Sequence, residues 1–175
     1  MKIIQLLKYK NANRTSARKV EYLRNQGCKI GKKTRLLCGI GSFGTEPYLI
    51  EIGEDCLLSS NISFFTHDGG VKVLNSLNYF DGEYMDKVGK IIIGNNCFIG
   101  HGVKIMPGIT IGDNVIVGAC AIVTKDVPSN SVVAGMPARV ICTIDDFYNK
   151  NKDRFYPTAK MPDEAKKEYL LNILG

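Results

Sequence analysis

The chain has 175 residues, of which 45% are apolar, 23% are charged and 9% are aromatic. This composition is typical of one soluble globular domain, and it excludes a disordered chain, a collagen and a bundle of membrane-spanning helices. A chain of this size can bury enough surface to form a core without disulfides or a structural metal.

The cysteines are the first feature that could suggest a compartment. No two of them have only two residues between them, and no secretory signal precedes them. The apolar run at residues 3–7 is too short for a signal peptide or a membrane span. We therefore expect a cytoplasmic location and reduced, mostly buried thiols. The cysteines are Cys28, Cys38, Cys56, Cys97, Cys120 and Cys142.

The net charge of +6 is concentrated at the start of the chain. Residues 1–35 hold eleven Lys or Arg and one acid, whereas residues 36–144 hold six against ten and residues 145–175 hold six against six. The basic segment is either a solvated helix face or a contact with a membrane surface or an anionic, lipid-linked substrate. Nucleic acid is not an expected partner, because no nucleic-acid-binding motif accompanies the charge.

The first predicted element is a helix over residues 14–26. Its apolar face carries Ala17, Val20 and Leu23. Gly27 ends the pattern, as glycine commonly does after a helix. We expect residues 1–29 to form an N-terminal helical cap on the domain that follows.

A six-residue spacing of aliphatic residues then dominates the sequence. Its unbroken run is Ile93, Ile99, Ile105, Ile111, Val117 and Val123. The same spacing occurs earlier at Ile52, Leu58 and Phe64, and Ile30 with Leu36 begins a still earlier run. A period of six matches neither the 3.6 residues of an α-helix turn nor the alternation of a simple strand. Glycine follows four members of the unbroken run, at 94, 100, 112 and 118.

This period predicts short straight segments joined by corners, with each aliphatic side chain pointing inward. Three segments close a triangle, so residues 18 apart should stack, and each coil should pair with its neighbours as in a solenoid. The expected stacks are Ile93 on Ile111, Ile99 on Val117 and Ile105 on Val123. Mostly short side chains, four residues after the inward positions, should pack near the corners. They are Cys97, Val103, Ile109, Val115, Ala121 and Val127. The predicted fold is an all-β solenoid over residues 30–144.

The repeat is interrupted once, after Phe64. The next aliphatic residue in register is Ile93, so an excursion loop over residues 68–90 leaves the coil within the sequence FFTHDGG and then returns. Loops of this length inside a compact domain are usually functional. His67 lies where the regular winding stops, and it is therefore a candidate for chemistry.

The C-terminal tail, residues 145–175, is predicted to be helical. A short helix is expected over residues 145–152 and a longer one over residues 162–174, with Pro162 near its first turn. We expect these helices to cover the last coil or to contact another copy of the chain.

The segment IIIGNNCFIGHGVKIMPGITIGDNVIVGACAIVTKDVPSNSVVAGMPARV resembles the closing coils of the hexapeptide-repeat acyltransferases, most closely the maltose, galactoside and polysaccharide O-acetyltransferases. The resemblance extends more weakly back to Ile30. It implies a left-handed parallel β-helix, a homotrimer with sites between subunits, and acetyl-coenzyme A as the acetyl donor. The periodicity alone fixes neither the hand nor the trimer.

The corner THDGG resembles the place where a histidine of this family closes a coil before an excursion, which implies that His67 is the general base. An imidazole can remove the proton of an attacking hydroxyl at neutral pH. His101, inside a regular coil, is expected to contact the cofactor or the acceptor. Asn61, Asp68 or Glu46 could orient the His67 ring, and Asn61 could instead serve as a corner residue that tolerates left-handed backbone.

Cofactor contacts are carried over from the resemblance. They are His101, Gly118, Ala119, Thr124, Lys125 and Arg139. Backbone amides near Gly118 would stabilise charge on the thioester oxygen. Lys125 and Arg139 would pair with the cofactor phosphates, although Lys125 could equally be a solvated turn lysine. Relatives commonly carry a further basic residue after the P-x-R-V-I run, where this chain has Cys142.

Aromatic and acidic residues gather in the excursion loop. Tyr79 and Tyr84 could stack on sugar rings, and Asp81 and Glu83 could accept hydrogen bonds from sugar hydroxyls. The alternative is that the aromatic residues dock the loop onto a neighbouring subunit.

Together these features predict an acetyl-coenzyme A-dependent O-acetyltransferase acting on a sugar or glycan precursor of capsule or lipopolysaccharide type, by direct transfer in a ternary complex and without a metal. One alternative is an N-acetyltransferase acting on an amino sugar or a xenobiotic. Another is a non-catalytic β-helix that serves as a binding or assembly subunit. A γ-class carbonic anhydrase is disfavoured, because two histidines are too few for a three-histidine zinc site.

Overall fold

The computed structural model describes residues 3–175, with side chains from residue 7 onward. The chain divides into two compact units, of which the first ends at Ile144 and the second is Asp145–Gly175. Among the described residues, no helix has the length and apolar character that crossing a membrane would require.

Two helices, α1 (Ile3–Ala12) and α2 (Ser16–Asn25), open the first unit. The apolar spacing predicted α2, whereas α1 was not predicted as a separate helix. Val20 and Leu23 of α2 are buried, but Ala17 is exposed, so the predicted apolar stripe is narrower than expected. Lys19 is also buried, and its Nζ donates to the carbonyl of Leu36 at 3.3 Å. These contacts attach α2 to the first coil.

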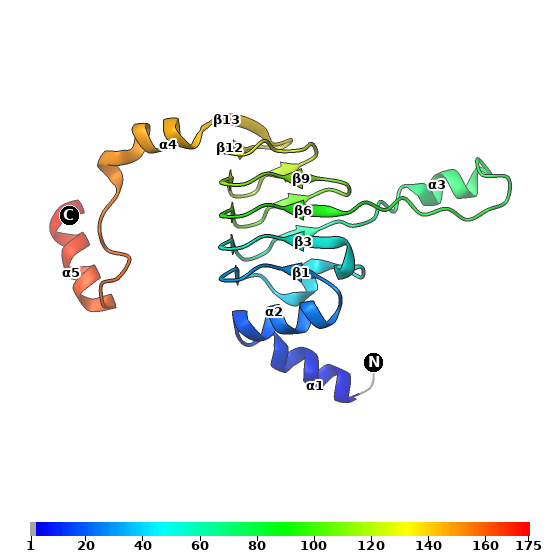
Figure 1. The fold of residues 1–175 in the computed structure, drawn as a ribbon, viewed down its shortest axis with the longest axis horizontal. Coiled ribbons are helices and arrows are strands. Elements are labelled where there is room, and N and C mark those ends of the chain that lie inside the picture. The colour runs from blue at the N-terminus through cyan, green and yellow to red at the C-terminus, as the bar shows by residue number, and fades with distance from the viewer. Residues whose placement is uncertain (1–2) are drawn as a thin grey trace. The chain divides into compact units, whose positions relative to one another are not determined.

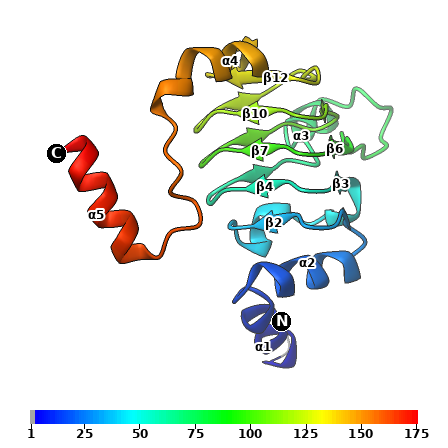
Figure 2. The ribbon, with the colours of Figure 1, turned by 60° about the vertical axis from the view of Figure 1, so that its left-hand side comes forward.

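Short strands follow, and in the described part of the chain they form three sheets. The first sheet contains β1 (Lys29–Ile30), β3 (Ile50–Ile52), β6 (Ile91–Ile93) and β9 (Thr110–Ile111). The second contains β2 (Arg35–Leu36), β4 (Leu57–Leu58), β7 (Phe98–Ile99), β10 (Ile116–Val117), β12 (Ser131–Ala134) and β13 (Arg139–Thr143). The third contains β5 (Ser63–Phe64), β8 (Lys104–Ile105) and β11 (Ile122–Val123). From β3 to β11 the chain visits the three sheets in turn. Figure 1 shows the stacked strands of the first sheet, and Figure 2 those of the second.

The register of these sheets confirms the predicted stacks. Each inward residue of one coil pairs with the inward residue 18 positions later. The observed pairs are Ile93 with Ile111, Ile99 with Val117 and Ile105 with Val123. All strand pairs are parallel except β12 with β13, an antiparallel pair at the end of the second sheet. The parallel ladders match the pairing of each coil with its neighbours that a solenoid requires.

The core is the column of inward side chains between the sheets. Ile99, Ile105 and Ile111 are fully buried, and the side chains predicted near the corners are also buried. Full burial of one such aliphatic side chain contributes about 1.5–3 kcal/mol. The glycine after the inward position allows neighbouring coils to approach closely. A Cβ on Gly94 would lie only 2.7 Å from the carbonyl carbon of Gly112 in the next coil.

The corner between the first and second sheets contains a vertical series of residues in the left-handed backbone region. Asp55, Asn96, Asn114 and Asn130 have φ values of 57°, 53°, 54° and 59°. Asparagine and aspartate tolerate this region better than other side chains with a Cβ. The Asn96 amide donates to Asn114 at 2.9 Å, and the Asn114 amide donates to Asn130 at 2.8 Å. In the first coil the equivalent residue is Lys33, with φ of 59°.

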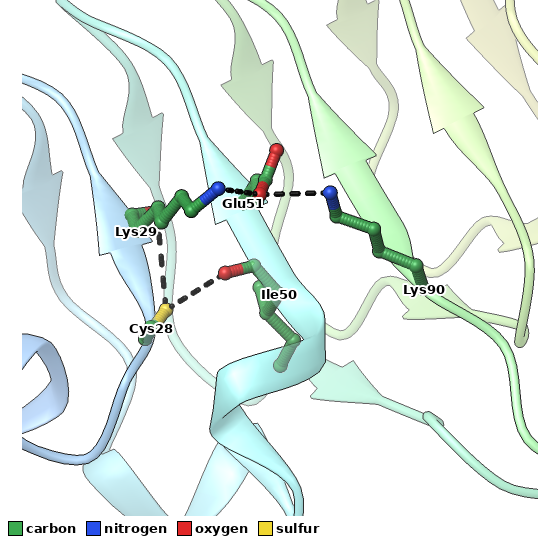
Figure 3. Close-up of polar contacts among 5 residues, drawn as sticks. All are labelled: Cys28, Lys29, Ile50, Glu51 and Lys90. Carbon is green, nitrogen blue, oxygen red and sulfur yellow. Dashed lines mark hydrogen bonds and ion pairs between the residues drawn. The ribbon is translucent and has the colours of Figure 1, made fainter.

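An ion-pair ladder crosses the outer face of the first sheet (Figure 3). Glu51 Oε1 lies 2.6 Å from Lys29 Nζ and 2.8 Å from Lys90 Nζ. Hydrogen bonds from these two lysines lower the pKa of Glu51 below its usual value. Beside the ladder, the Cys28 thiol donates to the carbonyl of Ile50 at 3.3 Å. Lys90 is the last residue of the excursion, so the ladder ties the returning chain to the sheet.

The cysteines are all free. Four of them, Cys28, Cys38, Cys56 and Cys97, are buried, which agrees with the expectation of small core residues. Cys120 is exposed and Cys142 is half-buried. Burial, with a smaller contribution from Glu51, raises the pKa of the Cys28 thiol to about 12.

The second unit, Asp145–Gly175, is mostly helical. It contains α4 (Ile144–Asn151), a 3-10 turn at Lys152–Arg154, and α5 (Asp163–Leu174). Pro162 is the N-cap of α5, immediately before its first turn. Within the unit, Tyr148 stacks on Phe155 with 6.3 Å between ring centroids.

Candidate active site

The excursion leaves the third sheet after β5 and returns as β6. Its two limbs pair antiparallel at their base, where His67 bridges Val88 and the amide of Gly89 donates to the carbonyl of Thr66 at 2.8 Å. Farther out, the loop contains helix α3 (Val71–Ser76), which was not predicted. Figure 1 shows α3 on an arm that projects from the stacked coils. His67 therefore lies at the root of the arm.

The His67 ring is held by a carboxylate from an earlier coil. Its Nδ1 lies 3.0 Å from Glu46 Oε2, and its side chain is 53% exposed. Glu46 precedes a 3-10 turn, Pro47–Leu49, in the segment between β2 and β3. Glu46 is thus far from His67 in sequence and adjacent to it in space.

Two threonines hold the same carboxylate. Thr66 donates to Glu46 Oε2 and Thr45 donates to Glu46 Oε1, each at 2.6 Å. These two hydrogen bonds, followed by the contact with His67, lower the pKa of Glu46 to about 2. An ionised carboxylate only accepts hydrogen bonds, so Nδ1 of His67 must be the protonated donor. The neutral ring therefore has its lone pair on Nε2, the nitrogen that can accept a proton.

The other two residues considered for orienting His67 do not contact its ring. Asp68 pairs with Lys87 Nζ at 2.9 Å and accepts from the amide of Gly70 at 2.9 Å. Asn61 has φ of 58° and occupies a corner, where its amide lies 3.4 Å from Nε2 of His101. Of the three candidates, Glu46 makes the contact. Asp68 instead fastens the limbs of the arm.

His101 differs from His67 because both of its ring nitrogens have partners. Nδ1 lies 2.9 Å from Ser60 Oγ, while Asn61 faces Nε2. The Asn61 amide nitrogen can only donate, so Nε2 of His101 accepts and Nδ1 carries the proton. The lone pair on Nε2 of His101 therefore already accepts a hydrogen bond from Asn61. In the described part of the chain, no hydrogen-bond partner faces Nε2 of His67.

The expected cofactor residues lie in the later coils. Gly118 and Ala119 follow β10, and Thr124 and Lys125 follow β11. The amide of Gly118 already donates to the carbonyl of Val133 at 2.8 Å, so this N–H is not available to a thioester oxygen. The neighbouring Ala119 is then the better candidate of the pair.

Lys125 shares a corner with His67. Phe64 pairs with Ile105 and Ile105 pairs with Val123, so Lys125, two residues after Val123, stands two coils from the start of the arm. Coils repeat at the spacing of neighbouring strands, which puts this step at about 10 Å. Lys125 and Arg139 are both exposed. The guanidinium of Arg139 donates to the carbonyl of Ala138 at 2.8 Å.

The four expected sugar contacts lie far along the arm, beyond α3. Tyr79 and Tyr84 are 68% and 90% exposed, and Asp81 and Glu83 are also exposed. Within the described residues of one chain, no hydrogen bond or ion pair joins these four to His67. The arm thus separates them from the histidine rather than gathering them around it.

Comparisons with known proteins place the chain in a family. The family model described as "Bacterial transferase hexapeptide (six repeats)" matches residues 90–125. Protein CapG of Staphylococcus aureus is 42% identical over 153 residues, which cover 86% of each chain. The galactoside O-acetyltransferase of Escherichia coli K12 is 44% identical over 101 residues, 58% of this chain and 47% of that protein.

A solved structure gives the same fold. The maltose O-acetyltransferase of Clostridium difficile 630 superposes with a TM-score of 0.52 at 28% identity, covering 78% of this chain and 82% of that one. The chain belongs to the hexapeptide-repeat transferase family, and within that family it is an acetyltransferase.

Proposed function

We propose that this chain transfers the acetyl group of acetyl-coenzyme A to a hydroxyl group of a sugar in a surface-glycan precursor, with His67 as the general base. The observation that carries the proposal is the contact between Glu46 and Nδ1 of His67, which leaves Nε2 able to accept a proton. The names of two relatives, a galactoside and a maltose O-acetyltransferase, support a sugar hydroxyl as the acceptor.

The proposed reaction is a direct transfer. As the sugar oxygen attacks the thioester carbonyl, its proton moves to Nε2 of His67, and the resulting imidazolium is stabilised by the ionised Glu46. The tetrahedral intermediate then collapses, the C–S bond breaks, and the coenzyme A thiolate leaves and takes up the proton held by Nε2 of His67, which restores the neutral ring. No covalent bond to the protein forms at any step.

Coenzyme A is proposed to lie along the corner that joins His67 to Lys125. The two-coil separation between these residues follows the stacking of β5, β8 and β11. Lys125 would contact the cofactor phosphates. Ala119 follows the second sheet and therefore lies at a different corner of its own chain, so it would face the thioester oxygen from the neighbouring copy. His101, Thr124 and Arg139 complete the proposed set of cofactor contacts.

The proposal includes a left-handed β-helix as the fold. It also includes a trimer as the active unit, with the sites between subunits. The exposed tyrosines of the arm favour this arrangement. Because they lie away from His67 in their own chain, they would reach a sugar or a coil in the neighbouring copy.

The test mixes the purified protein with acetyl-coenzyme A and with each member of a panel of galactosides, glucosides, disaccharides and amino sugars. The release of free thiol is measured. Hydrolysis without acceptor is subtracted, and the product is identified by mass and by its ester or amide linkage. Acceptor-dependent thiol release with an ester product is expected. An amide product would mean that the acceptor is an amine and not a hydroxyl. If no acceptor caused release of thiol, a binding or assembly role would be favoured instead.

A further inference from the structure

A groove lies at the opposite end of the solenoid from the closing hairpin, between α2 and the corner that joins β1 to β2. Its volume is about 520 Å³. The lining residues are Ser16, Ala17, Val20, Glu21, Arg24, Gly31, Lys32, Lys33, Thr34 and Arg35. This is the corner between the first and second sheets, whereas His67 follows the third sheet. The groove and the acetyl-transfer site are therefore at different corners.

The groove is strongly basic. Arg24, Lys32, Lys33 and Arg35 line it together with one acid, Glu21. The ion pairs between described residues involve other cations, so the four basic groups are not neutralised within the chain. The Arg24 guanidinium donates to the carbonyl of Ile30 through Nε at 3.0 Å and through Nη2 at 2.5 Å, and Nη2 also donates to the carbonyl of Gly31 at 3.2 Å. These contacts fix the Arg24 side chain at the edge of the groove.

Lys33 stands where the fold itself favours another residue. The same left-handed corner position is Asp or Asn in the four later coils, at Asp55, Asn96, Asn114 and Asn130, and only the first coil has a lysine. A lysine in this backbone region costs more free energy than asparagine, because its Cβ crowds the carbonyl and its side chain gives no local hydrogen bond. Backbone preference therefore does not explain why a lysine occupies this corner. The position of Lys33 in the wall of the groove explains it.

We propose that this groove binds a phosphate-bearing anion of about the size of a diphosphate group. Arginine binds phosphate oxygens through a planar fork, which Arg35 can offer, and the ammonium groups of Lys32 and Lys33 add further donors. Arg24 contributes positive charge at the edge, because its Nε and Nη2 already donate to backbone carbonyls. The group could belong to a soluble diphosphate or to a phosphate-bearing lipid. The inference does not depend on the proposed acetyl transfer.

The test measures binding of two probes to the full chain at low ionic strength. Sodium pyrophosphate is titrated by calorimetry, and vesicles of phosphatidylcholine with phosphatidic acid are compared with pure phosphatidylcholine vesicles by co-sedimentation. The variants are Lys33→Asn and Lys32→Gln. Lys104→Gln removes one charge from an exposed strand position on the third sheet and serves as the matched control.

Wild-type binding to either probe is expected, weakened about fivefold by each groove variant and unchanged by Lys104→Gln. The probe that binds identifies the source of the phosphate. Lys33→Asn restores the residue type of the later corners, so loss of binding in this variant cannot be attributed to unfolding. Equal weakening by Lys33→Asn and Lys104→Gln would mean simple attraction to net charge, and that result, or absence of binding to both probes, would overturn the inference.

Discussion

The regular coils and the arm are adjacent in the chain, but different interactions hold their side chains in place. In the coils, Ile99, Ile105 and Ile111 are fully buried and repeat one packing solution. At the arm, His67 is half exposed and is held by hydrogen bonds with Glu46 instead of by apolar contacts. The repeat therefore forms the packed core, and the proposed base lies where the repeat is interrupted. The two regions should therefore respond to substitution in opposite ways.

The largest effect is expected at the arm. His67→Gln removes the proposed base and should lower kcat by about 10²–10⁴-fold, while the free energy of unfolding changes by less than about 0.5 kcal/mol because the ring is half exposed. His101→Gln is the matched variant, and it should raise KM more than it lowers kcat, because both ring nitrogens of His101 are already bound. Steady-state kinetics with thiol detection measures both. A normal rate for His67→Gln would remove this histidine from the chemistry.

The coils should show the reverse pattern. Ile105→Ala leaves a cavity between two neighbouring coils and should lower the free energy of unfolding by about 2–5 kcal/mol. Lys104→Ala, on the outward side of the same strand, should change it by less than about 0.5 kcal/mol. Urea denaturation followed by circular dichroism measures the difference. Equal effects for the two variants would contradict the inward orientation of Ile105.

A smaller effect on rate is expected from the residue that orients the base. Glu46→Gln keeps the size of the side chain but removes its charge, and it should lower kcat by about ten- to a hundredfold. Glu46→Asp keeps the negative charge that accepts from Nδ1, so it should recover part of the rate that Glu46→Gln loses. Glu54→Gln, an exposed carboxylate on another corner, is the control. Equal rates for Glu46→Asp and Glu46→Gln would mean that the charge of Glu46 has no part in orienting His67.

The same substitution gives a pH dependence of stability. The pKa of Glu46 is lowered from 4.5 to about 2, so its ionised form is favoured by folding. That contribution is complete above pH 4.5 and is lost as the pH falls through about 2. The difference in Tm between wild type and Glu46→Gln should therefore be constant at neutral pH and shrink below pH 4.5. A difference that grows on acidification would contradict this sign.

The smallest effect concerns the one coil that departs from the corner pattern. Lys33→Asn should raise the free energy of unfolding by about 0.5–1 kcal/mol, because asparagine tolerates the left-handed corner better than lysine. Lys32→Ala, next to the left-handed position, should give no such gain. Thermal denaturation compares the two variants. Destabilisation by Lys33→Asn would mean that the lysine contributes to the fold itself, and the basic groove would lose its main argument.

Much of the fold could be read from spacing. Stacking at 18 residues follows from a six-residue period and three sides, so Ile93 on Ile111 was predictable without any tertiary information. Helix α3 was not predicted, although Val71 and Leu74 have a helical spacing, because six residues are too few for a clear periodic signal and none of their side chains is buried. Ala17 also departed from expectation, since only the part of α2 that meets the first coil is buried.

The candidate site was predictable only in part. The interruption of the repeat pointed to His67, but its partner could not be chosen among Asn61, Asp68 and Glu46. Asp68 is adjacent to His67 in the sequence, but its carboxylate pairs with Lys87 instead. Thr45 and Thr66, which hold the Glu46 carboxylate, gave no signal beyond their position beside Glu46 and His67.

By itself, the sequence determined the period of the coil, the inward residues and the place where the winding stops, because these depend on the order of side chains along one chain. The tertiary structure alone decided which carboxylate faces His67 and which basic groups line one groove. The first contact joins residues of different coils, and the groove joins a helix to the first coil. The lengths of the irregular segments between these elements set their alignment. No local periodicity encodes those lengths.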